Sequence, residues 1–207
     1  MNTKPVPKDP TSLNDSGCCF VENILSEDCR KLLLTALCFS EIDINHNNPQ
    51  VHGAYELYNT FFLNIINQIL LDKVKKITKI DALYSTYAFY RKYLSGQDLK
   101  KHTDRPECEV SITICLGESD ENEEWPIYLE NKEQKVIYEG VTKPGDGVIY
   151  KGCQLPHWRN KCNKKWTRQF FSHYSSNVGL EFDKKNQSNN IQNVITSYLI
   201  KTILENN

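Results

Sequence analysis

The chain has 207 residues, of which 39% are hydrophobic and 25% are charged, and this length and composition fit one domain with a buried core. Its 25 basic and 26 acidic residues leave a formal net charge of −1, without the positive excess that binding to nucleic acid or to an anionic membrane surface requires. The polar N-terminus does not contain a secretory signal, and no apolar run is long enough to span a bilayer. We therefore expect a cytoplasmic protein with neither nucleic-acid nor membrane partners.

The composition divides the chain into three segments. Residues 1–18 are polar and contain prolines, which predicts a flexible lead-in. Residues 19–176 carry the apolar patterns of a folded domain, and residues 177–207 form a polar linker followed by an amphipathic helix that we expect to pack on the core. The eight cysteines show no CxxC spacing, so in a cytoplasmic protein we expect reduced thiols.

Two helices are predicted in the first part of the domain. In the segment 23–40, Ser26 occupies an N-cap position before apolar residues at helical spacing. A second helix is predicted within 55–76, where apolar residues follow a similar period: Leu57, Phe61, Ile65, Leu70 and Val74.

From residue 81 onward the sequence changes to short aromatic and β-branched runs separated by Gly, Pro and acidic turns. These runs predict strands at 82–94, 109–116, 125–130, 134–140, 146–152 and 167–174. We therefore expect a mainly β fold, a sandwich or barrel core with flanking helices.

The stretch KKHTD places His102 and Asp104 two residues apart, and on a strand such residues project from the same face. Further along, a Gly-rich turn and a short strand lead to His157. Two imidazoles and one carboxylate form the facial triad of non-haem Fe(II) oxygenases, which leaves three coordination positions of the metal open. The three residues are therefore the predicted iron ligands and the catalytic centre.

Arg168 lies on the strand predicted to follow His157. A guanidinium is planar and permanently charged, and it binds a carboxylate through two hydrogen bonds. The far carboxylate of 2-oxoglutarate would need such a group when the keto acid end of the molecule chelates iron. Arg168 is thus the predicted cosubstrate anchor.

With these residues in view, the sequence resembles the Fe(II)/2-oxoglutarate-dependent dioxygenases, and within them the prolyl-hydroxylase-like branch. The resemblance is carried by YLSGQDLKKHTD, which fits a YxxGxxxxxHxD pattern, by PGDGVIYKG, His157 and Arg168, and by the opening FVENILSEDCRKLL. It covers roughly residues 20–175. The fold that it implies is a double-stranded β-helix, a jelly-roll or cupin-like core with helices packed on one side.

The resemblance also implies a role for each matching residue. His102, Asp104 and His157 would ligate Fe(II), Arg168 would hold the distal carboxylate of 2-oxoglutarate, and Tyr93 would donate a hydrogen bond to this cosubstrate. The other cosubstrate would be O2, with ascorbate as a reductant. The implied reaction hydroxylates a C–H bond of the substrate and releases succinate and CO2.

Substrate contacts are predicted at Trp158 and Arg159, which follow His157 directly, and at Trp125 and Tyr128. The acidic run 118–124 replaces a Gly-Gly pair that many relatives carry; it is a solvated loop, or it favours a cationic substrate if it overhangs the pocket. The nucleic-acid demethylase branch would carry a second arginine six residues after Arg168, but that position is Tyr174.

Two other functions stay open. The same three ligands would serve a zinc or iron hydrolase, which leaves Arg168 without a role, and a jelly roll without catalysis would be a binding module. The substrate of a hydroxylase would be a prolyl residue of a peptide, a free amino acid or another small molecule. The sequence does not specify the oligomeric state.

Overall fold

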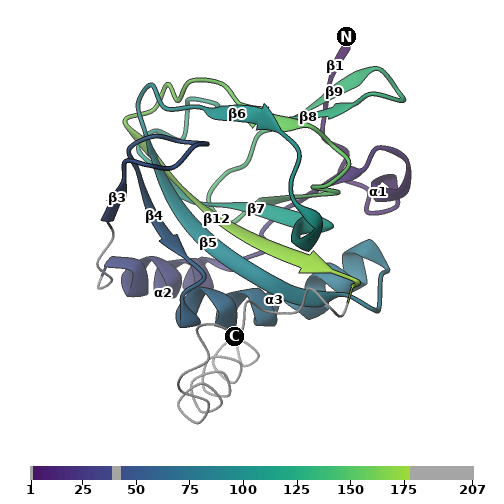
Figure 1. The fold of residues 1–207 in the computed structure, drawn as a ribbon, viewed down its shortest axis with the longest axis horizontal. Helices are drawn as coiled ribbons and strands as arrows, with labels where there is room; N and C mark the ends of the chain where they lie inside the picture. The colour runs from purple at the N-terminus through teal and green to yellow at the C-terminus, as the bar shows by residue number, and fades with distance from the viewer. Residues whose placement is uncertain (1, 39–42, 178–207) are drawn as a thin grey trace.

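The computed structural model describes residues 2–38 and 43–177. Within these residues the strands form two β-sheets that face each other, with two long helices beneath the larger sheet (Figure 1). The major sheet has the order β2-β10-β7-β12-β5-β4-β3, and the minor sheet has the order β1-β9-β8-β11-β6. Apart from the parallel pair of β1 and β9, the pairings are antiparallel.

The strands of the major sheet are β2 (Cys18–Val21), β3 (Asp43–Asn45), β4 (Ala54–Tyr58), β5 (Tyr84–Leu94), β7 (Val110–Glu118), β10 (Gly147–Tyr150) and β12 (Trp166–Ser175). Those of the minor sheet are β1 (Asn2–Pro5), β6 (Leu99–His102), β8 (Ile127–Asn131), β9 (Val136–Gly140) and β11 (His157–Arg159). The helices are α1 (Ser12–Asp15), α2 (Glu27–Cys38), α3 (Phe61–Thr78) and the short 3-10 helix η1 (Pro106–Cys108).

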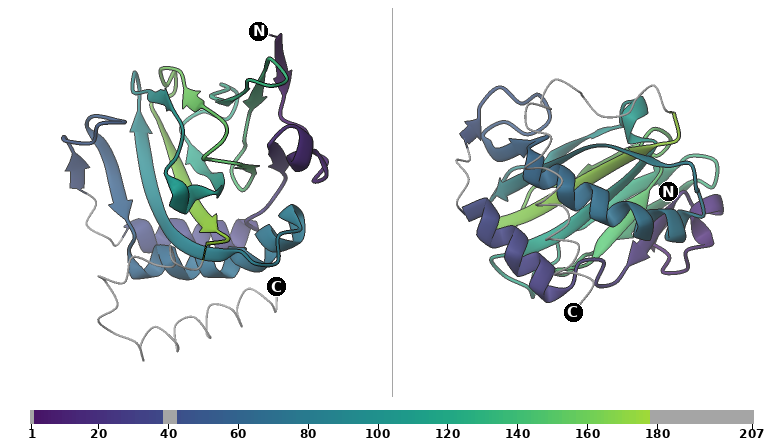
Figure 2. Two further views of the ribbon diagram at one scale, coloured as in Figure 1. Left: turned by 45° about the vertical axis from the view of Figure 1, so that its right-hand side comes forward. Right: turned by 90° about the horizontal axis from the view of Figure 1, so that it is seen from below.

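Helices α2 and α3 lie side by side across the outer face of the major sheet (Figure 2). Ser26 caps α2, since its hydroxyl accepts a hydrogen bond from the N–H of Cys29 at 3.3 Å, and the Thr60 hydroxyl accepts one from the N–H of Leu63 to cap α3. Apolar residues of both helices form one buried cluster with alternate residues of β5, β7 and β12. The other residues of these strands point toward the minor sheet, which creates an interior between the sheets.

The predicted fold class is confirmed, because two facing, mostly antiparallel sheets with helices on one side form a jelly-roll, double-stranded β-helix core. The segments predicted as strands contain β5, β9 and β10, and they overlap β7, β8 and β12 with ends that differ by at most two residues. The remaining strands of the described region are short, and the apolar patterns did not indicate them.

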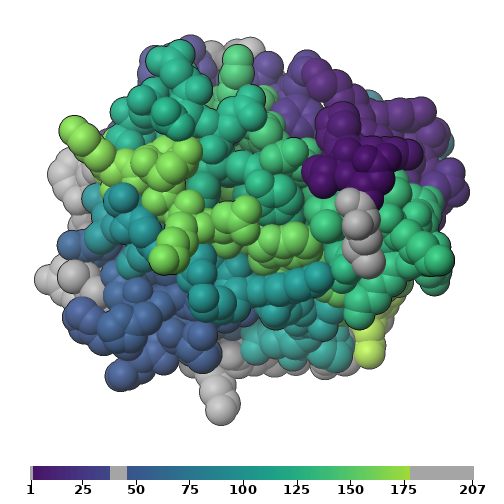
Figure 3. Space-filling view, turned by 90° about the horizontal axis from the view of Figure 1, so that it is seen from above, coloured from purple at the N-terminus to yellow at the C-terminus, as the bar shows by residue number. Residues whose placement is uncertain are grey.

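Two predicted boundaries differ from the structure. Residues 2–5 are not a free lead-in, because they form β1, which lies at the surface beside β9 (Figure 3). Backbone pairing needs no apolar side chains, so the polar sequence gave no sign of this strand. The second helix begins at Phe61 after its Thr60 cap, and residues 54–58 form β4 instead.

The predicted C-terminal helix lies outside the described residues. None of the seven cysteines whose side chains the structure describes forms a disulfide. In the described part of the chain, no helix combines the length and the apolar character needed to cross a membrane.

Candidate metal centre

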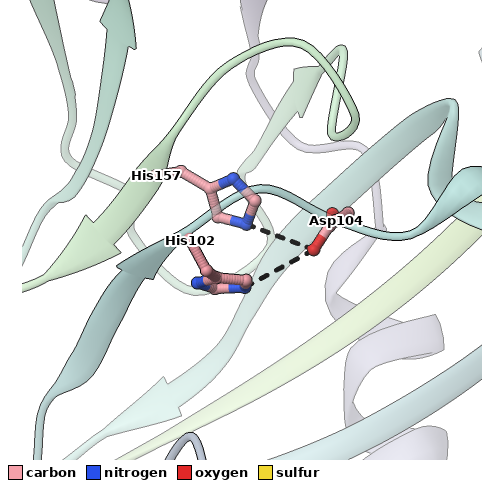
Figure 4. Close-up of side chains that lie close together, drawn as sticks. All are labelled: His102, Asp104 and His157. Atoms are coloured by element: carbon pink, nitrogen blue, oxygen red, sulfur yellow. Dashed lines mark ion pairs between the residues drawn. The ribbon is translucent and has the colours of Figure 1, made fainter.

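The side chains of His102, Asp104 and His157 converge on one point beside the minor sheet (Figure 4). His102 ends β6 and His157 begins β11, and antiparallel pairing sets the two histidines opposite each other. Asp104 follows β6, and its backbone N–H donates a hydrogen bond to the carbonyl of Gly152 at 3.0 Å. Strand pairing thus unites the three residues that the sequence singled out.

Backbone carbonyls determine the tautomers of both histidines. Nδ1 of His102 lies 2.7 Å from the carbonyl oxygen of Lys100, and Nδ1 of His157 lies 2.9 Å from that of Leu155. Because a carbonyl only accepts, each Nδ1 carries a proton and each neutral ring keeps a lone pair on Nε2. These Nε2 atoms lie 3.5 Å and 3.4 Å from Oδ1 of Asp104. Three electron-pair donors therefore face one point, and a divalent cation would satisfy all three.

The pKa values of Asp104 and His102 also show that this site favours positive charge. Burial alone would raise the pKa of Asp104, but the two imidazoles, which donate Nε2–H to its carboxylate when they are protonated, hold it well below its ordinary value. Burial alone would lower the pKa of His102, yet the hydrogen bonds that its protonated ring makes to Asp104 and to the carbonyl of Lys100 outweigh this and raise it. Two imidazole nitrogens and one carboxylate oxygen suit Fe(II), so the donor set fits this metal.

The three side chains line a cavity of about 50 Å³, which extends inward to Tyr150, Phe171 and His173. His102 and Asp104 also line a wider groove of about 460 Å³. Its other walls come from Gln50, Tyr58, Tyr87, Thr103 and Arg105. The metal position is therefore reached from a groove with two phenol rings and one guanidinium.

Arg168 does not reach this centre. Its cross-strand neighbours are Lys92 and Gly117. The next residue on its face of β12 is Phe170, which belongs to the core between the major sheet and the helices. Its guanidinium lies over the ring of Trp166, 4.5 Å from the ring centroid. Because side chains alternate along a strand, this register turns Arg168 to the face of the major sheet opposite the interior.

Arg159 occupies the interior instead. It lies two residues after His157 on β11, so both side chains point inward. Its Nη1 donates to the carbonyl of Trp125 at 2.8 Å, and its Nη2 lies 3.4 Å from Oγ1 of Thr113 and 3.3 Å from Oε1 of Gln169.

Arg159 has no ion-pair partner among the described residues, and its guanidinium lies over the ring of Trp125, 4.6 Å from the centroid. The residue is 1% exposed, and burial lowers its pKa, although a guanidinium keeps its charge in proteins. No carboxylate among residues 2–38 and 43–177 pairs with it, and its Nε has no hydrogen-bond partner there. A buried cation without a counter-ion costs several kcal/mol, which an anionic ligand would offset.

The other candidate residues divide between the inside and the outside of the molecule. Tyr93 is buried in the interior, where its hydroxyl accepts a hydrogen bond from Nη1 of Arg91 at 3.0 Å and its ring meets the edge of Trp125. Tyr128 and Trp158 stack on each other, with centroids 5.5 Å apart. Trp158 alternates with His157 on β11, so this pair lies on the outer face of the minor sheet, away from the cavity.

The groove residues Tyr58, Tyr87 and Arg105 were not among the site residues predicted from the sequence. Tyr87 shares the inward face of β5 with Tyr93, so alternation along the strand was a usable signal. Arg105 follows Asp104 directly. Tyr58 gave no signal, because its segment was assigned to a helix.

The acidic run 118–124 does not overhang the cavity. Glu118 pairs with the buried Lys164 at 2.7 Å. Glu121 lines a separate open groove of about 710 Å³, which no residue of the triad lines. The run therefore gives no support for a cationic substrate.

No family model matches the sequence, and no curated protein is similar to it. Solved structures do share its fold. A 2OG-Fe(II) oxygenase-family oxidoreductase from Burkholderia pseudomallei aligns with a TM-score of 0.70 and 10% identity, covering 86% of this chain and 96% of that one. A Pseudomonas putida prolyl-4-hydroxylase aligns at 0.61 and 14% identity, over 81% of this chain and 97% of that one.

HygX from Streptomyces hygroscopicus, solved with nickel and 2-oxoglutarate bound, aligns at a TM-score of 0.63 and 9% identity, over 83% of this chain and 87% of that one. At these identities the likeness establishes the fold. The chain shares the double-stranded β-helix fold of these three solved structures.

Proposed function

We propose that this protein is an Fe(II)- and 2-oxoglutarate-dependent oxygenase that hydroxylates a C–H bond of its substrate and releases succinate and CO2. The observation that carries the proposal is the convergence of two neutral imidazole nitrogens and one carboxylate oxygen at the mouth of a groove, on this fold. Bound Fe(II) would supply the oxidising chemistry with O2, and ascorbate would serve as a reductant. The Fe(II) ion would be held by His102, Asp104 and His157.

We assign the distal carboxylate of 2-oxoglutarate to Arg159 in place of Arg168. One strand repeat of two residues spans about 6.6 Å, a separation that a five-carbon dicarboxylate can bridge between His157 and Arg159. Arg159 also offers an unused donor and a charge without an ion-pair partner in a buried position, which are the properties that a carboxylate anchor requires. Arg168 has neither the position nor the burial.

Tyr93 would support the same carboxylate. Its hydroxyl accepts a hydrogen bond from Arg91, so its own proton stays available to a ligand. Its ring and the Arg159 guanidinium both lie against the ring of Trp125, at 4.9 Å and 4.6 Å from the ring centroid. The cavity at the metal position is lined by Tyr150 and Phe171 but not by Arg159. Cosubstrate binding therefore requires side chains between the metal and Arg159 to shift.

The substrate would enter through the groove of about 460 Å³. Tyr58 and Tyr87 lie with ring centroids 5.3 Å apart, and the Arg105 guanidinium lies over Tyr87 at 4.5 Å. Aromatic walls suit an apolar ring or chain, and the guanidinium suits a carbonyl or carboxylate oxygen. A prolyl residue in a peptide, a free amino acid or a related small molecule carries both features. A hydrolase with the same ligands would leave Arg159 without a role.

An anaerobic titration with Fe(II) and 2-oxoglutarate tests the proposal, because a keto acid that chelates ferrous iron gives a weak visible charge-transfer band. We expect this band in the wild type and no band in His157→Ala. Absence of the band in a wild type that binds Fe(II) would contradict the oxygenase function.

A matched pair of arginine variants tests the anchor. We expect Arg159→Gln to need at least about 10-fold more 2-oxoglutarate for the same band, because the variant loses a charge-assisted hydrogen bond to the carboxylate. Arg168→Gln should titrate like the wild type. The opposite pattern would return the anchor to Arg168.

A further inference from the structure

The two oxygens of Asp104 have different surroundings. Oδ1 faces Nε2 of both His102 and His157, whereas Oδ2 accepts a hydrogen bond from the hydroxyl of Ser111 at 3.1 Å. Ser111 lies on the inward face of β7 and is fully buried. A Cβ on Gly152 would lie only 2.4 Å from Oδ2, so backbone closes the other side of this oxygen. The carboxylate thus offers one oxygen to the metal position, and the other is held.

The hydroxyl of Ser111 also contacts His173, at 2.8 Å from Nδ1. A hydroxyl has one proton, and its two possible acceptors here are Oδ2 of Asp104 at 3.1 Å and the carbonyl of Cys108 at 3.4 Å. Because Oδ2 is nearer and ionised, Ser111 donates to Asp104. Nδ1 of His173 must then carry a proton and donate it to the oxygen of Ser111. This count makes a directed chain of hydrogen bonds from His173 through Ser111 to Asp104.

The ring of His173 cannot turn freely. It is 3% exposed and packs against Tyr87 and Phe89, with centroid distances of 4.5 Å and 5.6 Å. Its Nε2 has no hydrogen-bond partner in the described part of the chain, so Nδ1 makes its one hydrogen bond there. A buried histidine that makes its one bond toward a metal-site carboxylate is placed to orient that carboxylate.

We propose that Ser111 and His173 are positioning residues that hold Asp104 as a one-oxygen metal ligand. The inference rests on the metal centre of the proposed function but not on 2-oxoglutarate. A carboxylate that bound through both oxygens would occupy a fourth coordination position, whereas one-oxygen binding keeps three positions open for cosubstrates. Ser111 and His173 would therefore preserve the open face of the metal.

Titration with Co(II) alone tests the inference, because the visible bands of cobalt report its coordination. We expect Ser111→Ala and His173→Leu to bind Co(II) about 10- to 100-fold more weakly, with altered bands. His173→Asn places an amide donor near the position of Nδ1 and should restore both properties. Ser172→Ala is the matched control, because Ser172 is buried on the helix-covered face of the same strand, between Phe170 and Tyr174 of the core cluster.

The possible failures can be told apart. If Ser111→Ala and His173→Leu keep wild-type affinity and bands while His157→Ala loses Co(II), the positioning role is wrong and the metal centre stands. If the wild type binds no Co(II), both proposals fail. A second group of side chains could also hold a cation, namely Asp104, Cys108 and His173. If Co(II) binding is lost in His173→Asn and Cys108→Ala but not in His102→Ala, this second group binds the metal and the inference is overturned.

Discussion

At position 152 the backbone approaches the metal centre so closely that only glycine fits. A Cβ there would lie 2.4 Å from Oδ2 of Asp104, 2.6 Å from the carbonyl of Cys108 and 2.7 Å from Oγ of Ser111. Two of these atoms belong to the carboxylate support, and the third is backbone, so none can move without disturbing the site. The requirement comes from space and not from a left-handed backbone, because Gly152 is not among the glycines with positive φ.

Gly152→Ala should therefore weaken the metal centre. We expect the affinity for Co(II) to fall about 10- to 100-fold, since Asp104 must leave its position. Gly117→Ala is the control, because a Cβ there meets only the Trp166 side chain, at 3.8 Å. Equal Co(II) affinity in the two variants would show that the site tolerates the added methyl group.

Protonation of His173 makes the stability of the folded protein depend on pH. Its complete burial lowers the pKa from 6.5 to about 4, so the histidine is neutral in the folded protein at pH 7. The unfolded chain binds the proton at its ordinary pKa. Stability from this group is therefore fully present above pH 6.5 and is lost as the pH falls toward 4.

We expect the metal-free wild type to lose roughly 3 kcal/mol of unfolding free energy between pH 7 and pH 4 through His173 alone. Urea unfolding of the wild type and of His173→Asn at both pH values, with a chelator present, isolates this contribution from the other titrating groups. The variant should show the smaller loss on acidification. Parallel losses would mean that His173 does not titrate with a lowered pKa.

At the scale of elements, alternation along two strands distributes the chemistry. On β11, His157 and Arg159 point into the interior and Trp158 points out. On β12, Gln169 and His173 point inward, whereas Arg168 points to the helix side. Which side chains face inward on each strand therefore decides which arginine lies in the interior between the two sheets.

Helix α3 supports this arrangement from beneath the major sheet. Leu70 is 1% exposed in the cluster that joins α3 to the sheet. We expect Leu70→Ala to lower the free energy of unfolding by about 2–5 kcal/mol, because it leaves a cavity. Gln68→Ala, at an exposed position of the same helix, should change it little. Urea denaturation compares the two, and an equal effect would contradict the packing described for α3.

At the scale of the whole molecule, the proposed metal position joins segments that lie far apart in the sequence. Its proposed ligands come from the end of β6, the segment after it and the start of β11. A cation that binds only the folded arrangement stabilises it by mass action.

Co(II) at 100 times its dissociation constant should raise the unfolding free energy by about 2.7 kcal/mol. For a chain of this size the melting temperature should rise by roughly 5–10 °C. Thermal unfolding with and without Co(II) measures the shift, and EDTA should reverse it. A similar shift in His157→Ala would place the cation elsewhere.

Much of the molecule was predictable because its signals are local. Helical periodicity indicated the buried face of α2, and aromatic and β-branched runs indicated the strands that build most of both sheets. The short strands β1, β4 and β11 were not predicted, since their pairing is made by backbone groups whose partners lie far away in the sequence.

The sequence by itself determined a mainly β core with flanking helices, because strand and helix patterns are properties of short segments. Together with the resemblance to a known family, it also indicated the jelly-roll class and the three side chains that meet at the proposed metal position. Only the tertiary structure decided that Arg159 and not Arg168 faces the interior, that Ser111 and His173 stand behind Asp104, and which residues wall the groove. These outcomes depend on how separate strands pair, and a shift of one residue in a strand's register turns every side chain to the other face.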